Sequence, residues 1–286
     1  MQQGQPSRTA LGAASHRAVH QILERGNIFA DPLATRILGA DLEEALRSAQ
    51  EDPSKRRMRL FIAVRTRFAE DALAASIERG VRQLVVLGAG LDTYAYRSSL
   101  PAGFRVFEVD HPATQAWKRQ RLAEAAIPVP PQLTFAPIDF ERETLADGLK
   151  AAGFDPAQQT FFTWLGVVPY LTQETVFSTL GFIARLPGGA HVVFDYANPA
   201  DPRANPDEDA LALQVLAERV ASLGEPFRSF FETGALRAKL TDLGFDEIED
   251  LGPALIRERY FPDRGTTSPD RGGHGHVLRA AAPGPG

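Results

Sequence analysis

The pattern of hydrophobic and polar positions divides the chain into two unlike parts. Residues 7–79 read as almost wholly helical, with breaks at Gly26, Pro32 and Pro53 and no convincing strand alternation. From residue 81 onward, short apolar runs alternate with helical stretches, and we expect strands at 82–88, 104–110, 132–138, 160–166 and 189–196. Because strands separated by helices need crossover connections, this alternation predicts an α/β fold with a mostly parallel sheet.

The chain beyond the fifth strand is less regular. Three prolines within 199–206 predict a loop, and 207–223 and 233–243 have the pattern of helices. Candidate strands at 245–251 and 274–280 would extend the sheet. We therefore expect an N-terminal helical cap at 1–79 and a core at 80–286, with a helical lid insertion at about 197–230 after the fifth strand.

Composition narrows the range of partners. The 286 residues suit one large domain or a core with a cap, and 44% hydrophobic content allows a sizeable interior. A formal net charge of −5 and a pI near 5.7 argue against nucleic acid, because phosphate binding needs clustered Lys and Arg. With no cysteine, disulfides, thiolate nucleophiles and cysteine-bound metals are excluded.

Nothing in the pattern indicates a membrane or an export signal. Residues 1–25 hold no continuous apolar block, and no stretch approaches the roughly 18 apolar residues of a membrane span. We expect a soluble, cytoplasmic protein without a membrane partner. The oligomeric state is open.

A glycine turn after the first strand points to a bound nucleoside. The apolar run ends in Gly88-Ala-Gly90, and missing side chains let a backbone approach a ligand closely. The second strand ends at Asp110, whose carboxylate can accept both ribose hydroxyls. Thr93 stands where a pyrophosphate-binding turn needs its third glycine. S-adenosylmethionine, which has a ribose but no phosphate, therefore fits better than a dinucleotide.

Some of these acids have simpler explanations. Asp92 could contact the cofactor or only cap the short helix that follows. Asp110 precedes a helix and could also be a cap, but its place at the end of a strand favours the ribose. Glu108 is the alternative ribose ligand.

An ordered set of motifs resembles the leucine carboxyl methyltransferase family, in particular its bacterial small-molecule branch of S-adenosylmethionine-dependent O-methyltransferases. The resemblance runs from about residue 9 to residue 278. Its motifs are Thr-Ala at 9–10 with Arg-Ala at 17–18, Ile-Phe-Ala-Asp-Pro-Leu-Ala at 28–34, Arg-Thr-Arg-Phe at 65–68, Leu-Gly-Ala-Gly-Leu-Asp-Thr at 87–93, Glu-Val-Asp-His-Pro at 108–112, Asp-Phe at 139–140 and Trp-Leu-Gly-Val-Val-Pro-Tyr-Leu at 164–171.

The resemblance implies a Rossmann-like sheet of seven strands with a helical lid, and it implies roles for individual residues. Gly88 and Gly90 would form the turn under the methionine moiety, and Asp110 would bind the ribose. Asp139 and Phe140 would bind the adenine, and Arg65 would hold the cofactor carboxylate with its two-pronged guanidinium. Leu165 departs from family members that act on proteins, which carry a glutamate there beside the cofactor.

Several residues are candidates for the acceptor side. Tyr170 is a core aromatic or, by the resemblance, part of the substrate pocket. Asp195 and Tyr196 close the fifth strand at the same edge, and Tyr196 is included as a candidate. Arg17 and His20 lie one helical turn apart and could face an acid together, although surface placement is the simpler expectation. His274 and His276 without a carboxylate partner make a poor metal site, so we expect no metal.

These features predict an S-adenosylmethionine-dependent O-methyltransferase that methylates a small molecule by in-line displacement. A carboxylate or a phenol could be the acceptor, and the absence of an obvious His–Asp pair favours a carboxylate, which is already ionised at neutral pH. Two alternatives stay open: a nicotinamide-dependent oxidoreductase, and a non-catalytic protein that binds S-adenosylmethionine.

Overall fold

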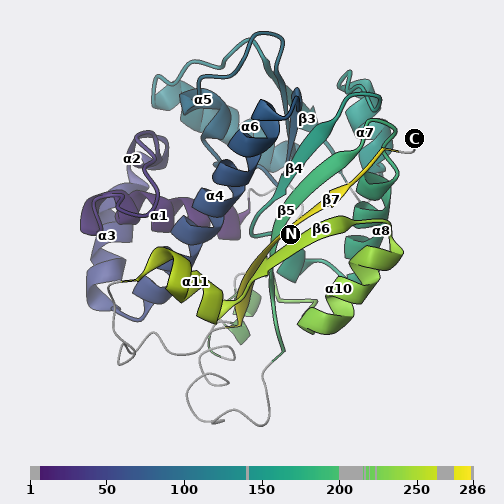
Figure 1. Cartoon of the computed structure of the whole chain (residues 1–286). Coiled ribbons are helices and arrows are strands. Elements are labelled where there is room, and N and C mark those ends of the chain that lie inside the picture. The colour runs from purple at the N-terminus through teal and green to yellow at the C-terminus, as the bar shows by residue number, and fades with distance from the viewer. Residues whose placement is uncertain are drawn as a thin grey trace.

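One seven-stranded sheet organises the molecule (Figure 1). The computed structural model describes residues 7–139, 142–199, 215, 217–218, 220–222, 224–262 and 274–284. The strand order is β3-β2-β1-β4-β5-β7-β6; β1 to β5 run parallel, and β7 runs antiparallel to both β5 and β6. The strands are β1 (Gln83–Leu87), β2 (Arg105–Asp110), β3 (Leu133–Pro137), β4 (Thr160–Trp164), β5 (Ala190–Ala197), β6 (Asp246–Leu251) and β7 (Gly275–Ala282). The predicted α/β class and the mostly parallel seven-stranded sheet are confirmed.

Helices precede and separate the strands in the predicted alternation. The part before β1 holds α1 (Arg8–Leu23), α2 (Ala34–Leu38), α3 (Asp41–Glu51) and α4 (Lys55–Glu78). The later helices are α5 (Tyr94–Arg97), α6 (Pro112–Glu124), α7 (Leu145–Ala151), the 3₁₀ turn η1 (Val168–Tyr170), α8 (Gln173–Ala184), α10 (Thr233–Asp242) and α11 (Pro253–Tyr260). The predicted helix at 207–223 lies largely outside the described residues.

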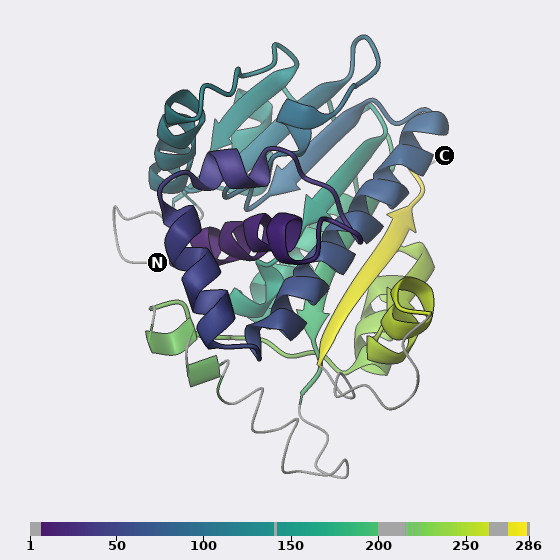
Figure 2. The same cartoon turned by 90° about the vertical axis from the view of Figure 1, so that its left-hand side faces the viewer.

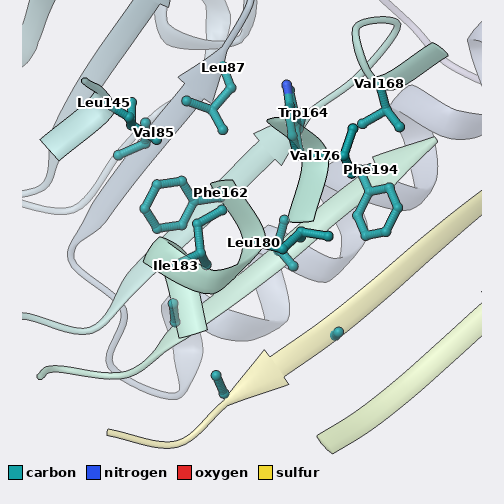
Figure 3. Close-up of a cluster of buried hydrophobic side chains, with 14 of the residues drawn as sticks. Val85, Leu87, Leu145, Phe162, Trp164, Val168, Val176, Leu180, Ile183 and Phe194 are labelled. Carbon is teal, nitrogen blue, oxygen red and sulfur yellow. The ribbon is translucent and has the colours of Figure 1, made fainter. Parts of the chain in front are cut away.

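Alternating side chains on each strand pack against different helices. On one face of the sheet, Val85, Phe162 and Phe194 pack with side chains of α7 and α8 (Figure 3). Side chains of α10 belong to the same buried cluster. On the other face, Leu84 and Val106 pack against α4 and α11. Both faces of the parallel strands are therefore covered, which explains their nearly continuous apolar sequences.

The N-terminal helices gather over one face of the sheet, where α4 runs along the strands (Figure 2). Leu60, Val64 and Phe68 of α4 belong to the same buried cluster as strand residues. Helices α1 and α2 join α6 in a third cluster through residues such as Ala14 and Ile37. The division into a cap at 1–79 and a core stays a prediction. Among the described helices, none is both long and apolar enough to cross a bilayer.

The strand order places a switch point between β1 and β4. The chain moves outward from β1 through β2 to β3 and then returns to add β4 on the other side of β1. In open α/β sheets, ligands bind outside the carboxyl ends of the strands at such a point. The segments after β1, β2, β4 and β5 are therefore where a site is expected.

Candidate functional site

The turn after β1 is shaped for close approach of the backbone. Gly88 and Gly90 have φ angles of +66° and +44°, which side chains with a Cβ rarely adopt. A Cβ at Gly88 would lie 2.4 Å from a methyl group of Val167, in the segment after β4. A Cβ at Gly90 would lie 3.0 Å from the Cβ of Ala10 in α1. The turn is thus packed between the end of β4 and the N-terminal helix.

Asp110 at the end of β2 is tied directly to this turn. Its Oδ2 accepts a hydrogen bond of 2.6 Å from the backbone N–H of Gly90, and its Oδ1 accepts one of 2.7 Å from His111. Burial raises the pKa of this carboxyl, although these hydrogen bonds oppose the rise. The cap of α6 is His111, which accepts from the N–H of Ala113. Asp110 is therefore positioned at the turn, and the alternative that it caps α6 is wrong.

Glu108 lies two residues earlier on the same face of β2 but is fully buried. Its Oε2 lies 2.6 Å from Nζ of Lys118 and 3.2 Å from the hydroxyl of Tyr96. The carboxylate is thus already paired inside the protein. This geometry favours Asp110 over Glu108 as the ribose ligand.

The end of the glycine turn is held by residues from the N-terminal helices. The N-cap position of α5 is Thr93, but Asp92 accepts a hydrogen bond of 2.8 Å from the N–H of Tyr94, the first residue of that helix, and its contact with the cofactor stays a prediction. The hydroxyl of Thr93 donates to the fully buried carboxylate of Asp31 at 2.7 Å. Arg17 donates to the carbonyl of Leu91 at 2.6 Å and also lies 3.3 Å from Asp31.

Arg65, Asp195 and Gly166 meet where β4 and β5 end. Nη1 of Arg65 donates to Oδ2 of Asp195 at 2.7 Å, and the N–H of Gly166 donates to Oδ1 at 2.5 Å. Only 8% of Arg65 is exposed, and its Nε has no hydrogen-bond partner among the described residues. A buried guanidinium N–H without a partner is a donor site for a ligand.

Tyr170 lies close to this pair, at the end of η1. Burial raises the pKa of its phenol to about 12, and the charges of Arg65, Asp195 and Glu225 also act on it. Within the described residues its hydroxyl forms no hydrogen bond. Its ring packs against that of Phe227, with centroids 5.4 Å apart. The hydroxyl is therefore a group that a second substrate could use.

The segment that begins at Glu225 joins Tyr170 to the N-terminal helix. The carboxylate of Glu225 accepts hydrogen bonds from the backbone N–H groups of Arg8 and Thr9, at 3.3 and 3.1 Å. Two N–H groups farther along the same segment donate to the carbonyl of Pro169, at 2.7 and 3.3 Å. This segment thus links helix α1 to η1 at the carboxyl edge of the sheet.

One predicted acceptor residue, Tyr196, lies away from the glycine turn. Tyr196 is 1% exposed, and its hydroxyl bonds with Asp250, Thr233 and His276. Neighbouring strand residues point to opposite faces, so the face that carries Asp195 cannot also carry Tyr196. The structure therefore does not bring Tyr196 to the glycine turn.

The expected pairing of Arg17 with His20 is also not found. Both side chains are buried, so the expected surface placement is wrong. His20 lies 3.3 Å from Glu24, which in turn bonds with Arg59 at 2.7 and 2.8 Å. Arg17 bonds with the glycine turn instead, so the two residues serve different contacts.

Asp139 and Leu165, two of the remaining predicted cofactor residues, follow strand ends. Asp139 follows β3, and its carbonyl accepts from the N–H groups of Arg142 and Glu143 at 2.8 Å each. Phe140 lies outside the described residues. Leu165 directly follows β4 and packs against the apolar cluster below α4, so it cannot replace a polar cofactor contact. The adenine role of Asp139 stays a prediction.

His276 of β7 differs from the expectation. Nδ1 of His276 lies 2.8 Å from Oδ1 of Asp250, so this histidine does have a carboxylate partner. Across the described ranges, no group of three or more His, Cys, Asp or Glu side chains is placed to hold a metal ion.

These features fit the amino-acid nucleoside that the sequence suggests. The turn has no room for side chains, the acid at the end of β2 is fixed beside it, and Arg65 keeps a buried N–H without a partner. Gly88, Gly90, Asp110 and Arg65 are the residues that would hold S-adenosylmethionine. When bound, that cofactor supplies a methyl group activated by a positive sulfur.

Known proteins agree with S-adenosylmethionine as the cofactor. A family model described as "Leucine carboxyl methyltransferase" matches residues 10–184. "Putative S-adenosyl-L-methionine-dependent methyltransferase YktD" of Bacillus subtilis (strain 168) is 31% identical over 291 residues, which cover 92% of this chain and 94% of that protein. A protein named "Putative S-adenosyl-L-methionine-dependent methyltransferase" from Mycolicibacterium paratuberculosis (strain ATCC BAA-968 / K-10) is 29% identical, over 95% of this chain and 82% of its own.

Solved structures share the fold. The crystal structure of a "putative methyltransferase" from Thermobifida fusca YX superposes with a TM-score of 0.57 at 16% identity, covering 99% of this chain and 97% of the other. The fold, the site and these relatives define an S-adenosylmethionine-dependent methyltransferase. The chain belongs to the leucine carboxyl methyltransferase family. The nicotinamide-dependent and non-catalytic alternatives are therefore not supported.

Sequence reasoning left some site residues without a role. Asp31, Gly166 and Glu225 were not among the candidates, and Asp195 was considered without being chosen. Gly166 and Asp195 did carry a signal, because both lie at the carboxyl ends of parallel strands, where ligands bind. Glu225 carried no such signal, because its partners, the hydroxyl of Ser7 and the N–H groups of Arg8 and Thr9, lie more than 200 positions away.

Proposed function

We propose that this methyltransferase transfers the methyl group to a carboxylate oxygen of a small organic acid and forms a methyl ester. The supporting observation is that Tyr170 offers a hydroxyl without a hydrogen-bond partner among the described residues, whereas the acids beside it are already bonded. Tyr170 has a pKa of about 12 and is therefore a hydrogen-bond donor at neutral pH, not a proton acceptor.

The two acids whose charges act on Tyr170 are already engaged. Asp195 bonds with Arg65 and the N–H of Gly166, and Glu225 accepts the N–H groups at the start of α1. His20 is fully buried beside Glu24. A phenol with a pKa near 10 needs a base at neutral pH, whereas a carboxylate with a pKa near 4 is already ionised.

The chain's own contribution is then orientation and exclusion of water. The hydroxyl of Tyr170 donates to one oxygen of the acceptor carboxylate and leaves the other as the nucleophile. Helix α1 and the segment from Glu225 cover the region and limit entry of water. Leu165, on an apolar cluster, suits an acceptor with an apolar body.

The test is methyl transfer from labelled S-adenosylmethionine to a panel of small carboxylic acids and matched phenols. A methyl ester releases labelled methanol in mild base, whereas a methyl ether does not. For a carboxylate acceptor, we expect kcat/KM to be nearly constant between about pH 6 and 9, because the acceptor stays ionised. A rise of about tenfold per pH unit with base-stable product would identify a phenol and contradict the proposal.

Tyr170→Phe tests the orienting hydroxyl. Since a hydrogen bond to a charged group contributes about 1.5–3 kcal/mol, we expect kcat/KM for the acid to fall by at least about tenfold. Binding of S-adenosylhomocysteine, measured by calorimetry, should not change. An unchanged kcat/KM would show that the hydroxyl does not contact the acceptor.

A further inference from the structure

Asp195 at the carboxyl end of β5 is fixed from two sides. Only 3% of the residue is exposed, and both carboxylate oxygens are used. Oδ2 accepts from Nη1 of Arg65 on α4 at 2.7 Å, and Oδ1 accepts from the N–H of Gly166 after β4 at 2.5 Å. The carboxylate therefore connects the helix layer to two strand ends at the site.

The contact with Asp195 sets the orientation of the Arg65 guanidinium. Nη1 is occupied, and Nη2 lies against Gly166, where a Cβ would stand 2.6 Å from it. Nε is buried without a partner among the described residues. A planar guanidinium binds a carboxylate through two parallel N–H groups only if its plane is held in the right direction.

The charges of Arg65 and Asp195 also match those of the amino-acid end of S-adenosylmethionine. Arg65 and Asp195 together carry no net charge, and the amino-acid end of S-adenosylmethionine is a zwitterion without net charge. A lone buried arginine would suit a simple anion better. Pairing it with an acid makes the site suit a group that carries both signs.

We propose that Asp195 is a positioning residue for the amino-acid end of the cofactor, and that it acts by orienting Arg65. The ribose would be held separately by Asp110, whose two carboxylate oxygens accept from the N–H groups of Gly90 and His111. Loss of Asp195 should therefore weaken only ligands that carry the amino-acid end. This inference does not depend on which acceptor the enzyme methylates.

The decisive experiment compares two probes with the Asp195→Asn protein. S-adenosylhomocysteine has the amino-acid end, and 5′-methylthioadenosine has the same nucleoside and sulfur without it. We expect the Kd of S-adenosylhomocysteine, measured by calorimetry, to rise by about tenfold or more, which corresponds to about 1.4 kcal/mol. The Kd of 5′-methylthioadenosine should stay within about twofold, or about 0.4 kcal/mol.

Asp71→Asn is the matched control. Asp71 forms a 2.8 Å ion pair with Arg67 on the same helix as Arg65, but both side chains are about half exposed. This change should leave both Kd values unaltered. A similar selective loss in the control would overturn the proposal.

Other outcomes distinguish the possible roles of Asp195. If it only neutralised Arg65, its removal would tighten S-adenosylhomocysteine; if it only stabilised the fold, both probes would weaken equally. Either result, or an unchanged Kd, overturns the proposal. The double variant that combines Asp195→Asn with Arg65→Gln should bind S-adenosylhomocysteine no more weakly than Arg65→Gln alone, because Asp195 acts through Arg65. Additive losses would show independent action.

A second variant reaches the same arginine without touching Asp195. Gly166→Ala adds a methyl group 2.6 Å from Nη2 of Arg65 and should displace the guanidinium. We expect the same selective loss of S-adenosylhomocysteine. Binding of 5′-methylthioadenosine reports that each variant is folded, and equal weakening of both probes would again count against the positioning role.

Discussion

Replacing Gly88 by alanine tests how closely the turn after β1 packs against the segment after β4. The residue has φ near +66°, and left-handed backbone costs an alanine about 1–2 kcal/mol. The added Cβ would stand 2.4 Å from Cγ2 of Val167, and overpacking of this kind costs about 1–3 kcal/mol. We expect Gly88→Ala to lower the free energy of unfolding by about 2–5 kcal/mol.

Val167→Ala separates the two contributions. It removes the methyl group that collides with the new Cβ but leaves the backbone strain in place. The double variant should therefore be more stable than the sum of the single changes predicts, by about 1–3 kcal/mol. Urea denaturation of the four proteins measures this coupling. A coupling below about 0.5 kcal/mol would refute the steric argument.

Three further changes test other parts of the site and its support. Asp110→Ala should raise the Kd of S-adenosylhomocysteine at least about tenfold, and an unchanged calorimetric Kd would limit this acid to its contacts within the turn. Burial raises the pKa of Glu24, but hydrogen bonds from His20 and Arg59 outweigh it and lower the pKa to about 2. Because this value lies below the ordinary 4.5, the ionised form stabilises the fold, and that contribution is lost as the pH falls from 4.5 towards 2. In the Glu24→Gln protein, the free energy of unfolding should therefore fall less steeply as the pH is lowered below 4.5. An unchanged dependence on pH in this range would contradict the argument. Arg17→Met removes the hydrogen bond that α1 donates to the glycine turn, and we expect the free energy of unfolding, measured in urea, to fall by at least about 1 kcal/mol. A smaller fall would mean that the fold does not depend on this contact.

The strand pattern was predictable because it depends on local order. All seven strands lie within two residues of the predicted bounds, since alternating and continuous apolar runs are read directly from neighbouring positions. The turn at Gly88 and Gly90 was also predictable, because only glycine accepts such φ angles readily. Asp110 followed from its place at the end of a strand.

Side-chain contacts between different elements were not predictable in the same way. Glu108 was kept as a ribose ligand because nothing near it in the sequence reveals the buried contact with Lys118. His20 is expected at the surface, but it is buried beside Glu24, and Arg59 of α4 bonds with that glutamate. In both cases the missing information was how side chains of another helix pack around the residue or its partner.

The amino-acid order alone determined the α/β class, the strand ends where a ligand binds and the glycine turn that would face a nucleoside. Those features depend on backbone preferences and on periodicity within short segments. Only the tertiary structure decided which of two adjacent residues, Asp195 or Tyr196, faces Arg65, a contact that spans 130 positions. The reason is physical: a strand alternates its faces at every residue, and the helix that covers each face is chosen by packing of the whole chain.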